Sequence, residues 1–382
     1  MTPPHAPDPE STNAEPEPSH AALRARDAET PGFEELTRGL LWPSLFRAPA
    51  LALRPDRVGL GLITLVVLAL LGSVPQLWGR PNLLSSLLVP SEERGAQIQM
   101  MADSDPVGAL LAVLSTPMHA VADRPLTFAL LGIPMLAVLA LGVGAVCRSA
   151  AREFALDQRD RWHESLAFVA ARAPSFVLTL LIPVLFVGGV YLLIAAGGFL
   201  LLTLPGVSLL GSVLFGLALL LGLLAAVAIV LGVLAIPLVV AAMACEGTDA
   251  VDAVQRSYAY AVARPLRLTL YFALADVLGL LLLLLVGAIA AITIGFTLHA
   301  ASAFGGVPIA AEDASRLWQA SSSVVGFWIN FVWLIVAGIG FSYACAACTV
   351  VYLLIRRVVD RQDPADLWSP DLGAAQQPGR PA

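Results

Sequence analysis

A run of 71 residues without a charged side chain, from Ser175 to Cys245, constrains this fold more than any other feature of the sequence. Within a bilayer, the backbone polar groups of such a run must be satisfied internally, and an α-helix does this with its own hydrogen bonds. A helix needs about 20 apolar residues to cross a hydrocarbon core of about 30 Å. The run therefore predicts either two membrane-spanning helices joined by an apolar turn or three tightly spaced ones.

The composition of the whole chain points to the same class. Hydrophobic residues make up 58% of the sequence and charged residues 13%, whereas roughly a quarter of a soluble domain is charged. The net charge of −6 gives no argument for a nucleic-acid partner. The first long apolar run begins at Val58, behind a Pro- and Glu-rich segment that lacks the basic start of a signal peptide. We predict an all-α, polytopic helical membrane protein.

Arginine placement decides between two and three spans in the long run, because cytoplasmic loops of membrane proteins are enriched in basic residues. With two spans the chain has six in total, and 18 of its 22 basic residues fall on one side. With three spans the division is 12 against 10. We therefore predict six spans with both termini cytoplasmic, at about 58–79, 125–147, 175–197, 212–244, 268–299 and 323–355.

The segments that flank the spans divide the chain further. Residues 1–32 and 358–382 are rich in Pro and polar residues and are predicted to be disordered cytoplasmic tails around a membrane domain at 33–357. Amphipathic helices are predicted before spans 1, 3 and 5, each closed by an Arg-Pro or Arg-Ala-Pro sequence. These closures favour a threefold repeat of units at 33–147, 148–244 and 245–357, although the cytoplasmic loops of any polytopic protein could look alike.

The charged island from Cys245 to Arg267 carries the clearest amphipathic pattern. Its apolar side chains recur at three- and four-residue spacing, and its polar side chains fall mostly on the other side. Asp252 and Arg256 are spaced for an i,i+4 ion pair. Arg264-Pro265 predicts the end of the helix, because a residue before proline avoids the helical conformation. We predict a helix that lies on the membrane surface.

Polar residues inside the predicted spans are few. Asp276 carries the formal charge that lies deepest in a span, and such a group is a functional candidate by default. The alternative is a structural carboxyl bonded to Ser342, to Tyr343 or to water. Asn330 is the second intramembrane polar candidate, with a role in helix packing as the simpler interpretation. Small residues spaced four apart, such as Gly338 and Ser342, favour close packing on span 6.

The four cysteines raise the question of a metal site. Cys345 and Cys348 have metal-ligand spacing, and Cys147 and Cys245 could lie at the same depth. The pair lies in an Ala- and Gly-rich helix without a flanking histidine, however, where cysteine behaves as a small apolar residue. We predict no metal and no cofactor. The sequence shows no phosphate-binding loop, nucleophile elbow or carboxylate cluster, so we predict no enzymatic activity.

The segment AMACEGTDAVDAVQRSYAYAVARPLRLTLY resembles the signature of a group of bacterial six-span membrane proteins of uncharacterised function. In that signature, E-G-x-x-x-x-x-A-x-x-R-S-Y, the matching residues are Glu246, Gly247, Ala253, Arg256, Ser257 and Tyr258. The group is loosely similar to the membrane domain attached to some glycerophosphodiester phosphodiesterases. No phosphodiesterase catalytic domain is present in this sequence, so that activity is not carried over, and the group supplies no established function. The resemblance implies a location in the bacterial inner membrane.

Two function classes remain open at this point. A scaffold or accessory protein would use its surface helices to organise lipid or to dock a membrane-protein partner or a second copy of itself. A transporter or permease-like subunit would use Asp276 as its coupling group. The near absence of polar residues in the spans favours the scaffold, because a solute pathway normally needs a polar lining.

Overall fold

The computed structural model describes residues 42–114, 116–202, 207–303 and 316–368. The chain divides into a unit at Met1–Trp42 and a unit at Pro43–Ala382, and only the second is described below as a packed body. The predicted tail at 1–32 and most of the predicted helix that follows it lie outside the described residues.

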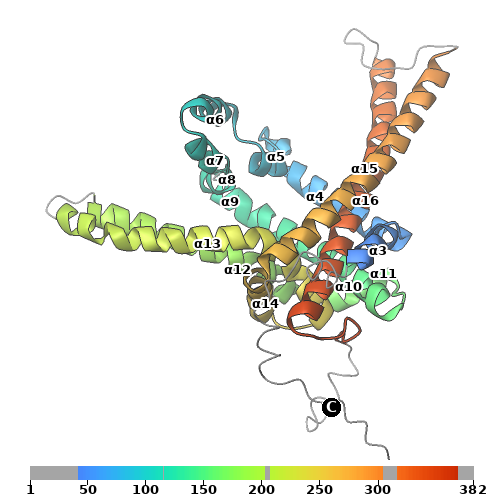
Figure 1. The fold of residues 1–382 in the computed structure, drawn as a ribbon. Helices are drawn as coiled ribbons and strands as arrows, with labels where there is room; N and C mark the ends of the chain where they lie inside the picture. The colour runs from blue at the N-terminus through green and yellow to red at the C-terminus, as the bar shows by residue number, and fades with distance from the viewer. Residues whose placement is uncertain (1–41, 115, 203–206, 304–315, 369–382) are drawn as a thin grey trace, which may run out of the picture. The chain divides into compact units, whose positions relative to one another are not determined.

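Every element in the described ranges is helical (Figure 1). In chain order the elements are η1 Trp42–Phe46, α3 Arg47–Ala52, α4 Pro55–Ser73, η2 Val74–Trp78, α5 Leu83–Leu88, α6 Glu92–Ser104, α7 Pro106–Leu114, α8 Thr116–Asp123, α9 Pro125–Thr127, the π-helical turn η3 Phe128–Gly132, α10 Ile133–Leu156, α11 Trp162–Ala170, α12 Ala173–Leu202, α13 Ser208–Glu246, α14 Ala250–Ala263, α15 Pro265–Ser302 and α16 Arg316–Val359. The all-α class predicted from the sequence is confirmed.

Six helical stretches in the described part are long and apolar enough to cross a membrane. They are Pro55–Trp78, Pro125–Leu156, Ala173–Leu201, Ser208–Glu246, Pro265–Ser302 and Leu317–Val359. The long uncharged run thus forms two helices, α12 and α13, in agreement with the six-span prediction. These helices pack against each other, as do α15 and α16 (Figure 1). At 1.5 Å per residue, α13 with its 39 residues is about 58 Å long, well beyond the roughly 30 Å of a hydrocarbon core.

Proline junctions set the start of several of these helices. Arg54 has an extended backbone and precedes Pro55 at the first position of α4, and Arg264 precedes Pro265 at the first position of α15. Proline suits this position because its missing N–H would have no helical partner there. α12 begins within the Arg172-Ala173-Pro174 sequence, as predicted. Arg124-Pro125 forms a further junction of this kind before α9, which the sequence analysis did not single out.

Small residues allow the helices to approach closely. A Cβ atom added to Gly61 of α4 would lie 3.0 Å from the carbonyl oxygen of Gly338 on α16. The hydroxyl of Ser342, one turn further along α16, donates a hydrogen bond of 2.8 Å to the carbonyl of Ala52 on α3. The predicted close packing of span 6 through small residues therefore agrees with the structure.

The most completely buried residues come from the ends of α10, α13 and α16 that lie near the charged segments. They include Ala145–Cys147, Leu238–Cys245 and Val350–Ile355. α3, α4, α14 and α15 contact the same helices. The large apolar side chains of the rest of α12, α13 and α15 are mostly exposed, as lipid-facing helices require.

Candidate functional site at the packed helix ends

The family-like motif lies where α13 ends and α14 begins. Gly247 ends α13 with a φ of 61°, a conformation that favours glycine. A Cβ atom at this position would also lie 3.0 Å from the indole ring of Trp368. Two independent constraints, backbone conformation and lack of space, therefore require glycine here.

Glu246 is the centre of the motif. Its carboxylate forms ion pairs with Arg256 of α14 and, at 3.4 Å, with Arg356 of α16, and it accepts a hydrogen bond from the hydroxyl of Tyr352. The Glu246 side chain is 8% exposed and that of Arg356 is 6% exposed. Because charges this far from water are stable only when paired, Glu246 holds α13, α14 and α16 together at their ends.

The remaining motif residues pack α14 in place. Ala253 and Ser257 are buried, and the Ser257 hydroxyl donates 2.8 Å to the carbonyl of Ala253 within the same helix. The hydroxyl of Tyr258 donates 3.4 Å to the carbonyl of Ala228 on α13. Arg256 also forms the predicted pair with Asp252, at 3.3 Å. Each of the six motif residues therefore has an intramolecular, structural role in this chain.

Charge interactions fix the protonation states on α14. Burial is the largest single influence on Arg256 and alone would lower its pKa, but the charges of Glu246, Asp252 and the neighbouring tyrosines together outweigh it, so the net shift of the pKa is upward. Burial, and next the hydrogen bond to Asp360, raise the pKa of Tyr260 above its usual value. Arg256 is therefore charged and Tyr260 neutral throughout the physiological pH range, which makes neither an acid–base group for chemistry near pH 7.

A strap at residues 360–368 closes over these helix ends. The carboxylate of Asp360 accepts a hydrogen bond from the hydroxyl of Tyr260. Arg356 donates hydrogen bonds to the side chain of Gln362, at 2.6 Å, and to the carbonyl of Asp366, at 2.9 Å. Leu367 is buried. The structure here differs from the sequence-based prediction, which assigned all of 358–382 to a disordered tail; residues 369–382 lie outside the described ranges.

Trp368 anchors the end of the strap. Its backbone N–H donates a hydrogen bond of 3.0 Å to the carbonyl of Cys245. Its carbonyl accepts a hydrogen bond of 2.7 Å from the side chain of Arg148 on α10. The Arg172 guanidinium lies 4.2 Å from the centroid of the indole ring, within the range of a cation–π contact. Burial lowers the pKa of Arg172.

A second buried ion cluster joins α4 to α10. Arg57 forms an ion pair of 2.6 Å with Glu153 and donates 3.0 Å to the hydroxyl of Ser149. Arg54 pairs with the other carboxylate oxygen of Glu153 at 2.5 Å. Asp157 ends α10 with a positive φ and lies 3.5 Å from Arg47. These contacts fix the start of span 1 against the end of span 2.

The structure does not bring Asp276 or Asn330 into either cluster. Both side chains are exposed, and within the described ranges the Asp276 carboxylate has neither a hydrogen bond nor an ion pair. The hydroxyl of Tyr343 donates to the carbonyl of Ala275, while that of Ser342 bonds α3, so neither supplies the partner considered from the sequence. Asp276 thus remains a candidate that has no hydrogen-bonding partner among the residues the structure describes.

The cysteines lie within the packed region. Cys147, Cys245 and Cys345 are buried, Cys348 is half-buried, and all four are free thiols. Cys147 Sγ donates to the carbonyl of Cys345 at 3.6 Å. Among the described residues, no group of three or more His, Cys, Asp or Glu side chains could hold a metal ion.

Sequence reasoning missed the residues whose partners lie far away along the chain. Arg148, Glu153 and Trp368 were not singled out, although each makes contacts that close the bundle end. A tryptophan at the start of an otherwise polar, Pro- and Gly-rich tail was the one available signal, because an aromatic ring in such a segment usually has a packing partner.

The six long apolar helices in the described part of the chain define a multi-pass integral membrane protein. No protein family matches the chain, and comparisons with curated proteins and with solved structures returned no match. The resemblance of the Glu246–Tyr258 motif to the bacterial six-span group therefore stays a prediction.

Proposed function

We propose that this protein is a non-catalytic scaffold or accessory protein of the bacterial cytoplasmic membrane, with its packed helix ends on the cytoplasmic side. The observation that carries the proposal is the way α14 is held. Glu246 clamps it to α13 and α16, and its buried face at Ala253, Ser257 and Tyr260 is fully used in packing. A helix fixed this firmly presents its other faces in a constant orientation.

One of those faces is exposed and mainly apolar. Val251 and Val262 are 52% and 61% exposed, and Tyr258, half-buried, lies between them at seven- and four-residue spacing on the same side of the helix. Gln255 is an exposed polar side chain on this face. Asp252 and Arg256 lie on a different side. An exposed apolar stripe beside a charged one is the pattern of a helix at a membrane interface, where it contacts lipid or a membrane-embedded partner.

The buried charges support a structural role for this end of the protein. Glu153 and Glu246 pair with arginines from neighbouring helices, and none of these groups is left to act on a substrate. The exposed apolar surfaces of α13 and α15 supply contact area for lipid and for a second copy or another membrane protein.

Site-specific fluorescence tests the interfacial placement. An environment-sensitive dye on Val262→Cys, in a background without the native cysteines, should show blue-shifted emission in liposomes and be quenched by spin-labelled lipid. The matched control is Ala263→Cys, which is also exposed but is the next residue around the helix. Equal, water-like emission at both positions would contradict the proposal.

A transporter or permease-like subunit is the second candidate. The observation that favours it is Asp276, an exposed carboxylate 11 residues past Pro265 and so about 16 Å along α15 from the start of the helix. Ionisable groups at this depth usually mark ion or substrate pathways. Asn330 does not extend this candidate site. Tyr343 of α16 contacts α15 beside Asp276, and Asn330 lies 13 residues from Tyr343, about 20 Å away along α16.

A further inference from the structure

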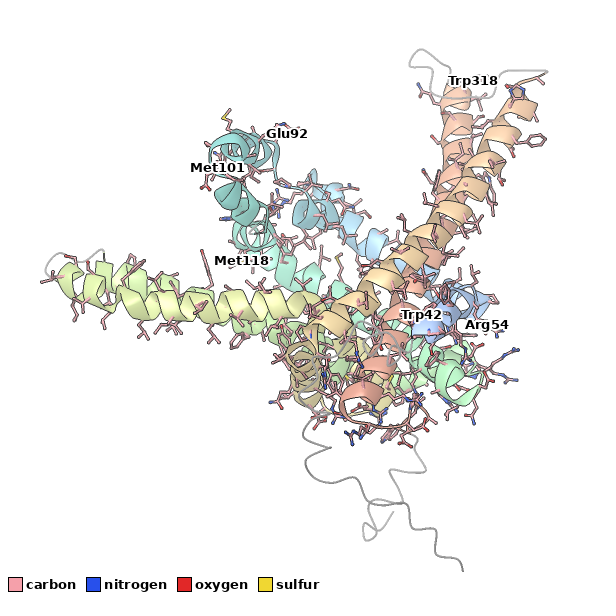
Figure 2. The ribbon with its side chains drawn as sticks, in the orientation of Figure 1. Trp42, Arg54, Glu92, Met101, Met118 and Trp318 are labelled. Carbon is pink, nitrogen blue, oxygen red and sulfur yellow. The ribbon has the colours of Figure 1, made fainter. Side chains whose placement is uncertain are left out.

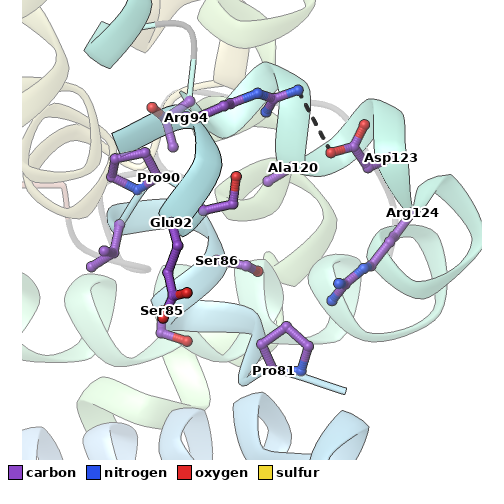
Figure 3. Close-up of a pocket in the computed structure, with 12 residues that line it drawn as sticks. Pro81, Ser85, Ser86, Pro90, Glu92, Arg94, Ala120, Asp123 and Arg124 are labelled. Atoms are coloured by element: carbon purple, nitrogen blue, oxygen red, sulfur yellow. Dashed lines mark ion pairs between the residues drawn. The ribbon is translucent and has the colours of Figure 1, made fainter. Parts of the chain in front are cut away.

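A cavity of about 340 Å³ lies in the connection between α4 and α10 (Figure 3). It is at the other end of these two helices from the Arg54, Arg57 and Glu153 cluster, as the labelled positions of Glu92 and Arg54 show (Figure 2). Its walls come from α5, the start of α6, α8 and the Arg124-Pro125 junction. The lining residues are Pro81, Ser85, Ser86, Val89, Pro90, Ser91, Glu92, Arg94, Thr116, Ala120, Asp123 and Arg124.

The cavity rests on a hydrophobic cluster of its own. Leu83 of α5 packs with Leu68 of α4, Phe128 of η3 and Met135 of α10, and Ala120 of the cavity wall packs against this cluster. The side chain of Asn82 accepts a hydrogen bond of 2.9 Å from the backbone N–H of Leu84 and so caps α5. The walls are therefore fixed to the two spans.

The charges that line the cavity balance and are incompletely paired. Glu92 and Asp123 are negative, and Arg94 and Arg124 are positive. Arg94 and Asp123 are 3.7 Å apart, longer than a hydrogen bond (Figure 3). In the described part of the chain, neither Glu92 nor Arg124 has an ion pair or a side-chain hydrogen bond. Both charges are left to meet a ligand.

The hydroxyl groups add acceptors on one side. Ser85 and Ser86 each donate 2.8 Å to a backbone carbonyl, of Asn82 and Leu83 respectively. Their protons are therefore committed, and each oxygen offers its lone pairs to the cavity. Together with the carboxylate of Glu92, they form a set of acceptors suited to an ammonium group.

We propose that this cavity binds a small zwitterionic group, with its anion at Arg94 and Arg124 and its ammonium at Glu92, Asp123 and the serine oxygens. A simple anion would leave Glu92 without a partner and a simple cation would leave Arg124 without one, whereas a zwitterion satisfies both charges at once. The volume of about 340 Å³ is at the small end of ligand sites, which suits a group of this size.

The position of the cavity favours a phosphoethanolamine group carried by a lipid. η2 ends at Trp78, whose side chain is 70% exposed, and tryptophan is enriched at the headgroup level of membranes. The cavity, which follows α4 and η2 in the chain, therefore lies at the depth of the lipid headgroups. Free phosphoethanolamine shares the same chemistry and is distinguished by the experiment.

Native mass spectrometry of the delipidated full-length protein in detergent measures the binding. Phosphatidylethanolamine, phosphatidylglycerol and soluble phosphoethanolamine are titrated separately. We expect phosphatidylethanolamine to bind more tightly than phosphatidylglycerol, and Arg124→Gln and Glu92→Gln each to weaken it about tenfold, the value of one charge-assisted hydrogen bond. The matched controls, Arg80→Gln and Glu93→Gln, remove a like charge close in sequence but outside the cavity lining, and should change the affinity less than twofold.

The other outcomes are decisive as well. Soluble phosphoethanolamine that binds as tightly as the lipid supports the zwitterion site and assigns it to a soluble ligand. Equal binding of phosphatidylglycerol and phosphatidylethanolamine overturns the proposal. So does wild-type affinity in both cavity variants, and thermal unfolding of each variant establishes that a loss of binding is not a loss of fold.

Discussion

Replacement of Glu246 by glutamine isolates the charge at the centre of the motif. Glutamine keeps the shape of the side chain and a carbonyl oxygen for the Tyr352 hydroxyl, but it removes the negative charge and replaces the oxygen that faces Arg256 with an amide donor. Arg356, whose side chain is 6% exposed, then has no carboxylate partner. Breaking a buried pair from one side costs about 3–5 kcal/mol.

The expected cost lies at the lower end of that range. Arg356 retains hydrogen bonds to Gln362 and to the carbonyl of Asp366, which still satisfy part of its guanidinium. The Arg256 side chain is 29% exposed, so water solvates much of its charge when the ion pair with Glu246 is lost, and the loss of that pair costs little. We therefore expect Glu246→Gln to lower the free energy of unfolding by about 3 kcal/mol, and Glu246→Ala to lower it by roughly 1 kcal/mol more because Tyr352 loses its acceptor.

Reversible unfolding in mixed detergent micelles measures these free energies. The matched control is Asp252→Asn, which removes the other carboxylate paired with Arg256, at 3.3 Å and 47% exposed, and should cost less than about 1 kcal/mol. The double variant with Arg356→Gln should cost less than the sum of the two single changes, because neither charge is then left alone. A Glu246→Gln protein as stable as Asp252→Asn would refute the central role of this carboxylate.

Further predictions concern pH, the thiols and topology. Because the pKa of Tyr260 is raised above the ordinary value of 10.0, its contribution is complete below pH 10 and stability should fall above it, by up to about 1.4 kcal/mol per pH unit; Tyr260→Phe should flatten this decline in an alkaline unfolding series. Replacement of all four cysteines by alanine should cost under about 1.5 kcal/mol each, with no metal detected by elemental analysis of the wild type. Single cysteines at Arg159 and Gln255 should be shielded from an impermeant thiol reagent in intact cells, while one at Ser91 should react, and labelling at position 255 would reverse the assigned orientation.

The spans and their starting points could be predicted because local physics decides them. A long uncharged run has to form membrane helices, and Arg-Pro sequences end one helix and begin the next without reference to the rest of the fold. The i,i+4 pair of Asp252 and Arg256 followed from spacing alone and is present. Such features depend on residues only a few positions apart.

The ion clusters could not be predicted because they depend on which helices meet. Arg57 and Glu153 lie 96 residues apart, and Arg148 and Trp368 lie 220 apart. The sequence placed Arg256 on a polar outer face, but did not show that Glu246 approaches it from the preceding helix. The strap was assigned to a disordered tail because its composition is polar. Its attachment through Trp368 depends on residues of α10, α11 and α13, which lie far from it in the sequence.

Substitutions of Asp276 can separate the scaffold and transporter proposals. Its exposed carboxylate forms no hydrogen bond or ion pair with the described part of the chain, so replacing it breaks no such contact. A charged side chain at the centre of a membrane helix costs about 2.5–3.5 kcal/mol on insertion scales. Both Asp276→Asn and Asp276→Leu should therefore fold at least as well as the wild type, and the matched Thr269→Val change, at an exposed hydroxyl bonded within α15, should be neutral. Unfolding in detergent and abundance in the membrane measure the stability of these variants.

A marked loss of stability in both variants would show that the carboxylate has a partner from outside the chain. A folded, abundant Asp276→Asn protein that fails to complement a deletion phenotype would place the transporter proposal first, because asparagine imitates the hydrogen bonds of a carboxyl but cannot take up or release a proton.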